Sequence, residues 1–547
     1  MHGLYAPPWL RHSVHREASP LRRCPSGETR MASRLGSMLL VLGLLGGAVT
    51  AQAEQQILPA AANLTAEQLF SVAFRPIIDN ALKQPNMPAL LGDGLRRVAA
   101  QDRTLGIVSV PGHLLLTREG VELARVVLPS DMIPERWANA TAEMLRAIAA
   151  ASPAIAAKDR EQVWRDMFDG MMTDLDPYSR YAEPNRAQGE RTQREGYDGI
   201  GVGIRSVDGF YEISDMVPDG PAAAAGVKVG DRIFEVAGTR TLGLPYERLS
   251  ALIQGPEGSW VEMKLGPSEQ RPRNVTIRRR HLVPNTVQAA INDGVVTVRV
   301  ERFNNATQDN VRQAIQRYLD RGPVRGVVMD LRGNPGGVMV QAVGVVNLFV
   351  PQGRIITTRG RNPSSIQWFE AQKPTTLFPD LPLVVLIDGQ TASSAEIVAA
   401  ALQDAGRALI VGSSSYGKGS VQHVTQLPNG GELFITWSRI YAPSGYSFDG
   451  QGVLPSLCTS QAGVNVQSLL AAAAQGDRGE QATRSRQRLA APDDAEALAQ
   501  LRATCPPKPA DSVASAAVTV SLARALVEDV GLYRQALASR HINVAER

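Results

Sequence analysis

The chain has 547 residues, enough for three or four domains. Hydrophobic residues make up 44% and charged residues 20%, which excludes a wholly disordered chain, a coiled coil and a multi-span membrane protein. Aromatic residues make up only 5%, too few for a stacking surface built for single-stranded nucleic acid.

The formal net charge of +4 arises in the first 53 residues. That stretch holds six arginines and two glutamates of the 57 Lys+Arg and 53 Asp+Glu in the chain, so the remaining residues are formally neutral. There is therefore no electrostatic case for a nucleic-acid partner.

Residues 1–53 are interpreted as a leader. Within it, residues 31–53 have the pattern of a secretory signal peptide: a basic segment, a short apolar run and Ala51-x-Ala53 as the cleavage site. An uncleaved N-terminal anchor is the alternative. Residues 1–30 are polar and aperiodic, and we interpret them as a start-site artefact. The expected location is the periplasm or cell envelope, with a protein that is soluble after signal cleavage.

Cys458 and Cys505 are the two cysteines outside the leader. An even number of cysteines in an exported chain makes them candidates for a disulfide. A metal site is weakly supported because no Cys or His lies at ligand spacing near either residue. Neither residue lies in the glycine-turn or helix-start setting of a reactive thiol. We expect no metal and no cofactor.

Residues 54–195 are predicted to be mostly helical. Thr65 followed by Gln68 fits a capping box at the start of the first helix. Further helices are expected at about 136–150 and 158–172.

Residues 196–282 are predicted to be a small β-rich domain. Short alternating runs separated by Gly, Pro and Asp indicate strands at Val202–Ser206, Phe210–Ser214, Arg232–Val236, Val261–Leu265 and Asn274–Arg278. The glycines at 199, 201 and 203 expose backbone N–H groups that can hold a carboxylate.

Residues 283–458 alternate between strands and helices, which favours a mainly parallel sheet with crossover helices. The expected strands are Gly294–Val300, Val324–Leu331, Leu383–Ile387 and Ala408–Val411, and the expected helices are Asp309–Arg321, 338–348 and Ser394–Asp404. Residues 459–547 contain helical segments rich in Ala, Gln and Arg and one Pro-rich break.

Two short blocks at strand ends carry candidate chemistry. The block at 330–337 (DLRGNPGG) is a glycine turn that can point N–H groups into a cleft, as an oxyanion hole requires. A plain strand-to-helix turn is the alternative. Ser393 lies where a helix begins, and the positive end of the helix dipole favours developing negative charge. Simple N-capping is the alternative there.

The third block places Lys418 between two glycines after an apolar strand. Burial would lower its pKa, so that the neutral amine could take a proton from a serine hydroxyl. Gln422, four residues on, can orient that amine. The alternative interpretation of Lys418 is an exposed surface lysine. Gly412 to Lys418 nearly matches a phosphate-binding loop, but the following Ser or Thr and the helix are missing, so nucleotide binding is not expected.

The blocks LDPYSRY, the glycine-punctuated β-rich region, LRGNPGG, the Ser393 block and GKGSVQ resemble, in that order, the C-terminal processing peptidases. These are exported Ser/Lys endopeptidases with an inserted PDZ domain. The resemblance implies an α/β multidomain fold. A mainly parallel, crotonase-like β/α core at 283–458 would be joined by a β-rich PDZ domain at 196–282 and by helical regions at 54–195 and 459–547.

Carried over by position, the resemblance implies that Ser393 is the nucleophile, Lys418 the general base and Gln422 the residue that orients it. It implies an oxyanion hole formed by the backbone N–H groups of Gly337 and Ser394. Asp404 matches a position that supports the site. This chain has Ser393-Ser394-Ala395 where the family commonly alternates Ser-Ala-Ser, so Ser394 is a rival nucleophile.

For the β-rich domain the resemblance implies that a peptide C-terminus adds as an edge strand. Its carboxylate would be held by the segment Gly199, Ile200, Gly201, Val202, Gly203 and Ile204, with Ile204 and Leu252 as pocket candidates. The expected partners are protein or peptide substrates with free C-termini. An adaptor protein and a homo-oligomer are left open. The alternative function is a catalytically inactive PDZ scaffold or adaptor in the cell envelope.

Overall fold

The computed structural model describes residues 63–475, 478–491, 493–509 and 513–540. The predicted leader, residues 1–53, lies outside the described residues. Among those that are described, no helix combines the length and the apolar composition needed to cross a bilayer.

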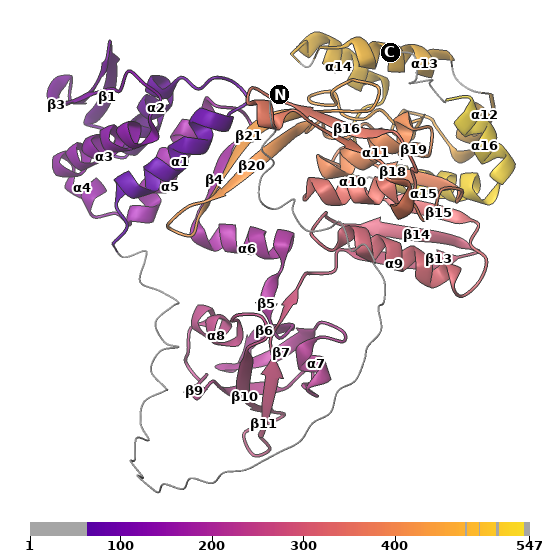
Figure 1. Ribbon diagram of the computed structural model, residues 1–547, viewed down its shortest axis with the longest axis horizontal. Coiled ribbons are helices and arrows are strands. Elements are labelled where there is room, and N and C mark those ends of the chain that lie inside the picture. Colours follow the sequence, from indigo (N-terminus) through magenta and orange to yellow (C-terminus); the bar gives the residue numbers. More distant parts are fainter. Residues whose placement is uncertain (1–62, 476–477, 492, 510–512, 541–547) are drawn as a thin grey trace, which may run out of the picture. The chain divides into compact units, whose positions relative to one another are not determined.

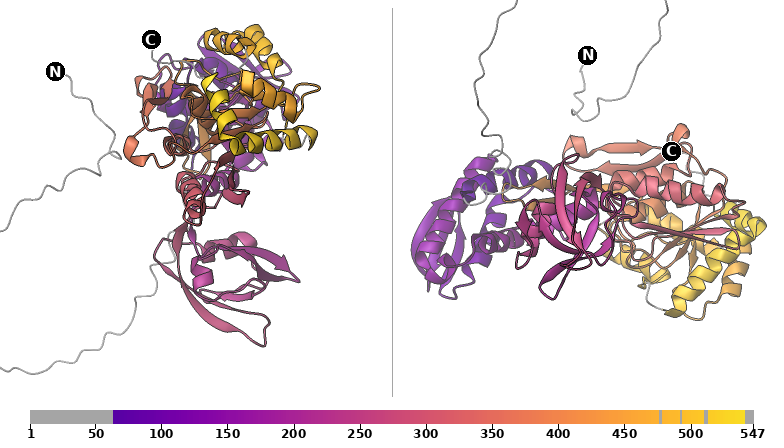
Figure 2. Two further views of the ribbon diagram at one scale, coloured as in Figure 1. Left: turned by 90° about the vertical axis from the view of Figure 1, so that its right-hand side faces the viewer. Right: turned by 90° about the horizontal axis from the view of Figure 1, so that it is seen from below.

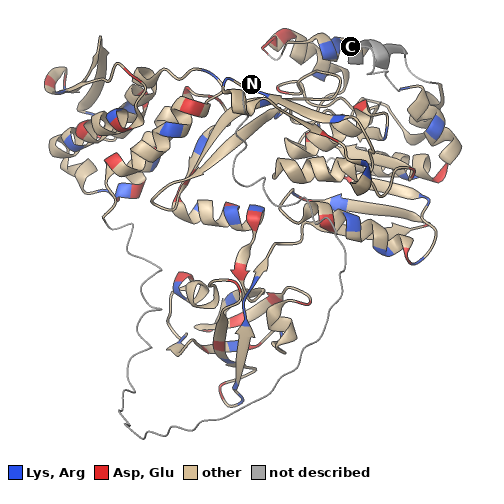
Figure 3. Cartoon of the chain, viewed as in Figure 1, with Lys and Arg blue, Asp and Glu red and all other residues tan. Residues whose placement is uncertain are grey.

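The N-terminal region is helical where the sequence predicted helices. The capping box is confirmed: Thr65 and Gln68 exchange side-chain and backbone hydrogen bonds at the start of α1. The helices are α1 (Ala66–Asn80), α2 (Met87–Ala99), α3 (Pro134–Ala151), α4 (Pro153–Ala156), α5 (Arg160–Thr173) and α6 (Pro184–Glu195). Basic and acidic residues are interspersed along α1, α2, α3 and α5 (Figure 3), and Arg75 pairs with Glu135 at 2.8 Å.

A three-stranded meander interrupts these helices and was not predicted. It comprises β1 (Leu105–Val110), β2 (His113–Arg118) and β3 (Val121–Val127), paired antiparallel in that order. The sequence contains a signal for it, because three runs rich in aliphatic residues are separated by the two-residue turns Pro111-Gly112 and Glu119-Gly120. Gly112 and Gly120 both have positive φ. The short turns therefore override the helical propensity of the flanking segments.

The β-rich region contains all five predicted strands in one sheet. Its order is β11-β10-β8-β7-β6, with β6 at one edge. The elements are β6 (Val202–Val207), β7 (Phe210–Met216), α7 (Pro221–Ala224), β8 (Arg232–Val236), β9 (Thr239–Arg240), α8 (Tyr246–Ile253), β10 (Trp260–Gly266) and β11 (Arg273–Arg278). The short strands β5 (Tyr197–Gly199) and β12 (Arg280–Leu282) pair with each other where the chain enters and leaves the region.

The predicted parallel sheet is confirmed (Figure 1). Its strand order is β13-β14-β15-β18-β19-β22, and all its pairs except β13–β14 are parallel. The strands are β13 (Val287–Asn292), β14 (Val295–Val300), β15 (Gly326–Asp330), β18 (Leu383–Ile387), β19 (Leu409–Gly412) and β22 (Leu457–Cys458). The crossover helices are α9 (Thr307–Leu319), α10 (Met339–Asn347) and α11 (Ser394–Asp404).

Helices cover both faces of this sheet, which explains why its strands are continuously apolar. One set of alternate strand residues packs with α9, α10 and α11. The other set packs with α12 (Val466–Gln475), α15 (Val513–Glu528) and α16 (Val530–Ala538) of the C-terminal extension. Figure 2 shows these C-terminal helices against the sheet in two further views. The extension also contains α13 (Arg478–Leu489) and α14 (Ala495–Thr504).

A second sheet carries the lysine block. Its order is β17-β16-β21-β20, and β4 pairs with β21. The strands are β4 (Arg180–Ala182), β16 (Arg354–Arg359), β17 (Gln367–Glu370), β20 (Ser420–Gln426) and β21 (Glu432–Tyr441). Because β4 comes from the LDPYSRY segment, this sheet brings residues near 180 beside residues near 420.

Candidate active site

The serine and glycine blocks meet at the carboxyl ends of neighbouring parallel strands. β15 ends at Asp330 and β18 at Ile387, and these strands pair in register. Loops that follow adjacent parallel strands emerge at the same edge of a sheet, which is where α/β proteins place their sites. The tertiary structure thus joins two blocks about 60 residues apart in the chain.

Ser393 occupies a strained turn between β18 and α11. It is the N-cap residue of α11 and has φ 54° and ψ −117°. A positive φ is uncommon for a residue with a Cβ and occurs where the surroundings impose it, often at active sites. A sharp strand-to-helix turn of this kind exposes the serine hydroxyl. No GxSxG motif marks the turn in this sequence.

Two glycines allow the neighbouring loop to approach this serine. A Cβ on Gly336 would lie 2.7 Å from the Cβ of Ser393, and a Cβ on Gly337 would lie 1.9 Å from the carbonyl oxygen of Phe303. Phe303 hydrogen-bonds to the carbonyl of Gly336 and the N–H of Val338. Phe303 thus pairs with the two neighbours of Gly337 and not with its N–H, and Gly337 lines the cavity.

Lys418 precedes β20 and is largely buried. Its Nζ donates to Oε1 of Gln422 at 3.2 Å, and it lies 5.3 Å from the ring centre of Tyr178. Burial lowers the pKa of Lys418, and nearby Arg180 lowers it further, while Asp176 and Glu396 act in the opposite direction. The net shift favours the neutral amine that a general base requires. The exposed-lysine alternative is wrong for this residue.

Gln422 is held in turn by the LDPYSRY segment. Its Nε2 donates to the carbonyl of Tyr178. The donated bond orients the side-chain amide so that its oxygen faces the lysine. Asp176 stabilises the turn that presents this carbonyl, because it accepts the N–H groups of Tyr178 and Ser179, each at 2.9 Å.

A buried carboxylate connects the serine turn with the lysine loop. Oε2 of Glu396 accepts the backbone N–H of Ser393 at 2.7 Å and that of Lys418 at 2.9 Å. Oε1 accepts the N–H of Gly417 at 2.7 Å and the hydroxyl of Ser415. Glu396 is completely buried, and desolvation raises its pKa to about 7 against the opposing effect of these donors.

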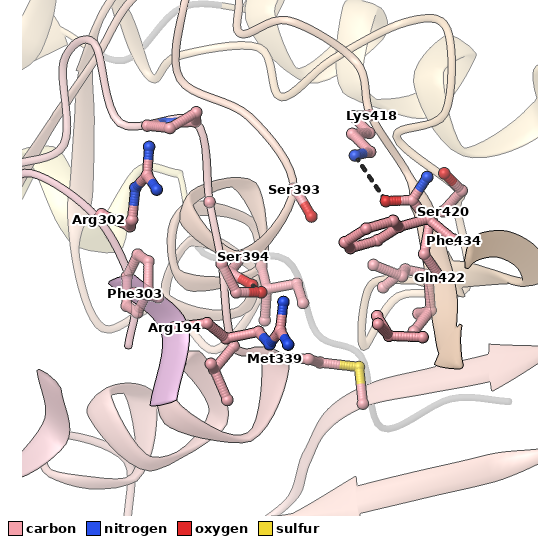
Figure 4. A pocket seen from close by; sticks show the side chains of 18 of the residues that line it. Arg194, Arg302, Phe303, Met339, Ser393, Ser394, Lys418, Ser420, Gln422 and Phe434 are labelled. Carbon is pink, nitrogen blue, oxygen red and sulfur yellow. Dashed lines mark hydrogen bonds between the residues drawn. The ribbon is translucent and has the colours of Figure 1, made fainter. Parts of the chain in front are cut away.

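The serine turn, the glycine loop and the Lys418–Gln422 pair line one cavity of about 450 Å³ (Figure 4). Its lining includes Gly337, Met339, Ser393, Ser394, Lys418 and Gln422. The cavity offers a hydroxyl, a desolvated amine and a glycine loop to one ligand, which is the set that acyl transfer needs. No hydrogen bond joins Ser393 to Lys418 among the described residues, and the amine is held on Gln422 instead.

The two adjacent serines differ in environment. Ser393 is half-buried in the cavity wall, whereas Ser394 is buried and its Oγ donates to the carbonyl of Gly337 at 2.9 Å. A hydroxyl that is committed to a neighbouring carbonyl is poorly placed for attack, so the geometry favours Ser393.

Asp404, predicted to support the site, lies apart from the cavity. It lies at the far end of α11, about 16 Å from Ser393 at 1.5 Å per residue. Its Oδ2 accepts the N–H of Ser444 at 2.9 Å, and it does not line the cavity. The 11-residue helix separates it from Ser393, and its Oδ1 lies 4.0 Å from Nη2 of Arg488 on α13.

The segment predicted to hold a carboxylate, residues 199–204, lies where β5 leads into β6. Gly201 has φ 78°, and β6 is an edge strand. Ile200 is 1% exposed and packs into the core of this region, so only its backbone can face a ligand. Ile204 and Leu252 are partly buried against the same core.

Cys458 and Cys505 form a disulfide. It connects the end of β22 to the residue after α14. Sequence reasoning gave no role to Tyr178, Glu396 or Arg502. Tyr178 and Arg502 contact the segment that carries Lys418 from distant parts of the chain. Glu396 lies on α11 itself, three residues after Ser393. For Glu396 a signal existed, since Ser393-x-x-Glu396 fits a capping box.

Two family models match the chain. Residues 294–458 match the peptidase family S41, and residues 212–265 match the PDZ domain. The carboxy-terminal-processing protease of Bartonella bacilliformis is 32% identical over 308 residues, which are 55% of this chain and 71% of that protein. The carboxy-terminal processing protease CtpA of Bacillus subtilis is 30% identical over 302 residues, which cover 55% of this chain and 64% of the relative.

A solved structure, the photosystem II D1 C-terminal processing protease, is 29% identical and matches with a TM-score of 0.33, covering 55% of this chain and 82% of that chain. The fold and the cavity, together with the two family models and the curated relatives, define a serine peptidase that carries a PDZ domain. The chain belongs to peptidase family S41.

Proposed function

We propose that this peptidase cleaves with Ser393 as nucleophile, Lys418 as general base and Gln422 as the residue that orients the lysine. The observation that carries the proposal is the shared cavity, in which a serine in a strained turn faces a lysine whose pKa burial lowers. The amine must leave its position on Gln422 far enough to reach the serine hydroxyl.

In the proposed reaction, Oγ of Ser393 attacks the peptide carbonyl carbon while its proton passes to Nζ of Lys418. The carbonyl oxygen becomes an oxyanion between the N–H groups of Gly337 and Ser394. The ammonium then gives its proton to the leaving amine, and the C–N bond breaks to leave an acyl-enzyme. A water, deprotonated by the same amine, hydrolyses the ester and restores both groups.

The PDZ-matching region is proposed to bind the substrate's C-terminus along the edge strand β6. The backbone of Gly199 to Gly203 would hold the carboxylate, and Ile204 and Leu252 would contact the terminal side chain. We also propose the division into residues 54–195, 196–282, 283–458 and 459–547. Export to the periplasm or envelope is proposed from the pattern of residues 31–53 and from the disulfide.

The two adjacent serines provide the test. The purified Ser393→Ala variant should lose cleavage of a peptide substrate by at least about a thousandfold, since removal of a nucleophile leaves only binding and oxyanion stabilisation. The matched Ser394→Ala variant keeps its backbone N–H and should retain cleavage. Retained cleavage by Ser393→Ala would refute Ser393 as the nucleophile. Loss of cleavage in Ser394→Ala alone would identify Ser394 as the nucleophile instead. Absence of cleavage by the wild type would favour the PDZ scaffold.

A further inference from the structure

The loop at 413–417 leads directly to Lys418, and the C-terminal extension holds it from outside the part of the chain that matches the family model. Oγ of Ser413 donates to the carbonyl of Lys508 at 3.2 Å and accepts its N–H at 3.1 Å. Oγ of Ser414 donates to the carbonyl of Cys505. The loop is therefore anchored by residues that follow it by about 90 positions.

Arg502 on α14 makes the contact nearest to the lysine. Its Nη1 donates to the carbonyls of Ser415 at 3.2 Å and Tyr416 at 3.1 Å, and it lies 3.4 Å from the carbonyl of Gly450. Gly450 in turn donates to the carbonyl of Gly417 at 2.9 Å. One charged donor thus joins the lysine loop to the chain segment packed beside it.

Glu396 connects the residues that Arg502 contacts with the serine turn and the lysine loop. The hydroxyl of Ser415 donates to Glu396, which also accepts the backbone N–H groups of Gly417 and Lys418. A displacement of residues 415 and 416 therefore disturbs the carboxylate that fixes both the lysine loop and the serine turn.

The disulfide sets the position of α14. Cys505 follows the last residue of α14 directly, and its partner Cys458 pairs with Gly412 across β22 and β19. Gly412 is the residue from which the lysine loop starts. The same covalent bond therefore holds both the beginning of this loop and the helix that carries Arg502.

We propose that Arg502 is a positioning residue for Lys418, which keeps the lysine loop closed around the amine, and that the Cys458–Cys505 disulfide holds Arg502 in that position. The inference deepens the proposed function and rests on it. Arg502 touches neither the cavity groups nor a substrate, so it acts through the loop.

The expected signature is a change in the pH dependence of the rate. The groups that face Lys418 are Arg180, Asp176 and Glu396, with the Tyr178 ring alongside. Burial is the largest effect on its pKa and lowers it, so opening the loop to water raises the pKa. The rate requires the neutral amine, so its acidic limb should then move to higher pH.

The experiment compares the full-length wild type with Arg502→Met, Arg502→Lys and Arg524→Gln. Arg524 lies on α15 of the same extension and pairs with Asp293 at 2.9 Å, away from the lysine loop. In Arg502→Met, the acidic limb of kcat should shift to higher pH by about one unit, which lowers kcat about tenfold at a pH on that limb and leaves KM nearly unchanged. Arg502→Lys should show a smaller shift of the acidic limb than Arg502→Met, and Arg524→Gln should show no shift.

A second arm tests the disulfide. The double variant Cys458→Ser/Cys505→Ser, and separately the mildly reduced wild type, should show a shift of the acidic limb in the same direction. If Arg502→Met does not fold, the Arg502→Lys variant and the reduced wild type carry the test.

A merely structural role would lower the rate in proportion to the loss of folded protein, with an unchanged pH profile, and this result would overturn the inference. Ser393→Ala separates the two proposals. If the wild type cleaves in a Ser393-dependent manner while the Arg502 variants and the reduced protein keep the wild-type profile, only the inference fails. If the wild type does not cleave, the proposed function fails.

Discussion

Nζ of Lys418 donates a 3.2 Å hydrogen bond to Oε1 of Gln422, four residues along the chain. A β-bulge between Val421 and Gln422 shifts the register of β20. The glutamine is thereby set beside the lysine at the start of the strand, and the Tyr178 carbonyl fixes its orientation.

Gln422→Glu should move the acidic limb of kcat to higher pH. A carboxylate beside the amine stabilises its charged form and so raises the pKa of Lys418, opposing the effect of burial. Below that pKa the lysine stays protonated and cannot act as a base, so the rate at a pH on the acidic limb should fall at least about tenfold. The measurement is a pH–rate profile. Gln426→Glu, at an exposed position on the same strand, is the control and should match the wild type.

Glu396→Gln should weaken both folding and catalysis. The amide offers one acceptor oxygen where the carboxylate offers two, so buried donors at Ser393, Gly417 or Lys418 lose a partner. An unsatisfied buried donor costs about 1–3 kcal/mol in the free energy of unfolding, and urea denaturation measures it. An unchanged unfolding midpoint together with full activity would contradict the bridging role of Glu396.

The titration of Glu396 predicts a pH-dependent stability. Its pKa is raised to about 7 in the folded protein, above the ordinary value of 4.5. Its contribution to stability is therefore complete below pH 4.5 and is lost as the pH rises through about 7, because ionising a buried carboxyl disfavours the folded state. Urea unfolding of wild type and Glu396→Gln across this window should show a steeper decline in the wild type.

Gly336→Ala should inactivate the enzyme. The residue has φ 97°, and a Cβ there would meet the Cβ of Ser393 at 2.7 Å. Gly353 has a similar φ of 95° with open space around it, so Gly353→Ala measures the backbone strain alone, about 1–2 kcal/mol. Gly336→Ala should be less stable than this control in thermal unfolding, and it should lose activity where Gly353→Ala does not. Equal activity in the two variants would argue against close packing at the serine turn.

Leu526→Ala should destabilise the peptidase core although the residue belongs to the C-terminal extension. Leu526 is fully buried on α15 and packs with the residues of the parallel sheet's second face. Loss of a buried leucine costs about 2–5 kcal/mol in unfolding free energy. Val520→Ala, on the same helix at 36% exposure, should cost much less. Chemical denaturation followed by tryptophan fluorescence compares them, and a neutral Leu526→Ala would show that the sheet does not depend on this helix.

The sequence alone identified the five long strands of the β-rich region, four strands of the parallel sheet and its three crossover helices, because their apolar periodicity and turn residues are local properties. It did not predict strands β16 and β17 of the second sheet. It also singled out Ser393, Lys418 and Gln422 through short blocks with recognisable turn chemistry. It did not reveal the meander at residues 105–127, whose short strands lie among strong helix formers.

Only the tertiary structure showed what surrounds those residues. Gln422 receives its orientation from a carbonyl 244 residues away, and Arg502 reaches the lysine loop from a segment with no recognisable motif. Both faces of the parallel sheet are apolar, and the strand sequences do not show that the C-terminal extension covers one of them. Side-chain type and periodicity are properties of the local sequence. The desolvation of a lysine and the partners of a buried carboxylate depend on distant segments packing together, which no local pattern encodes.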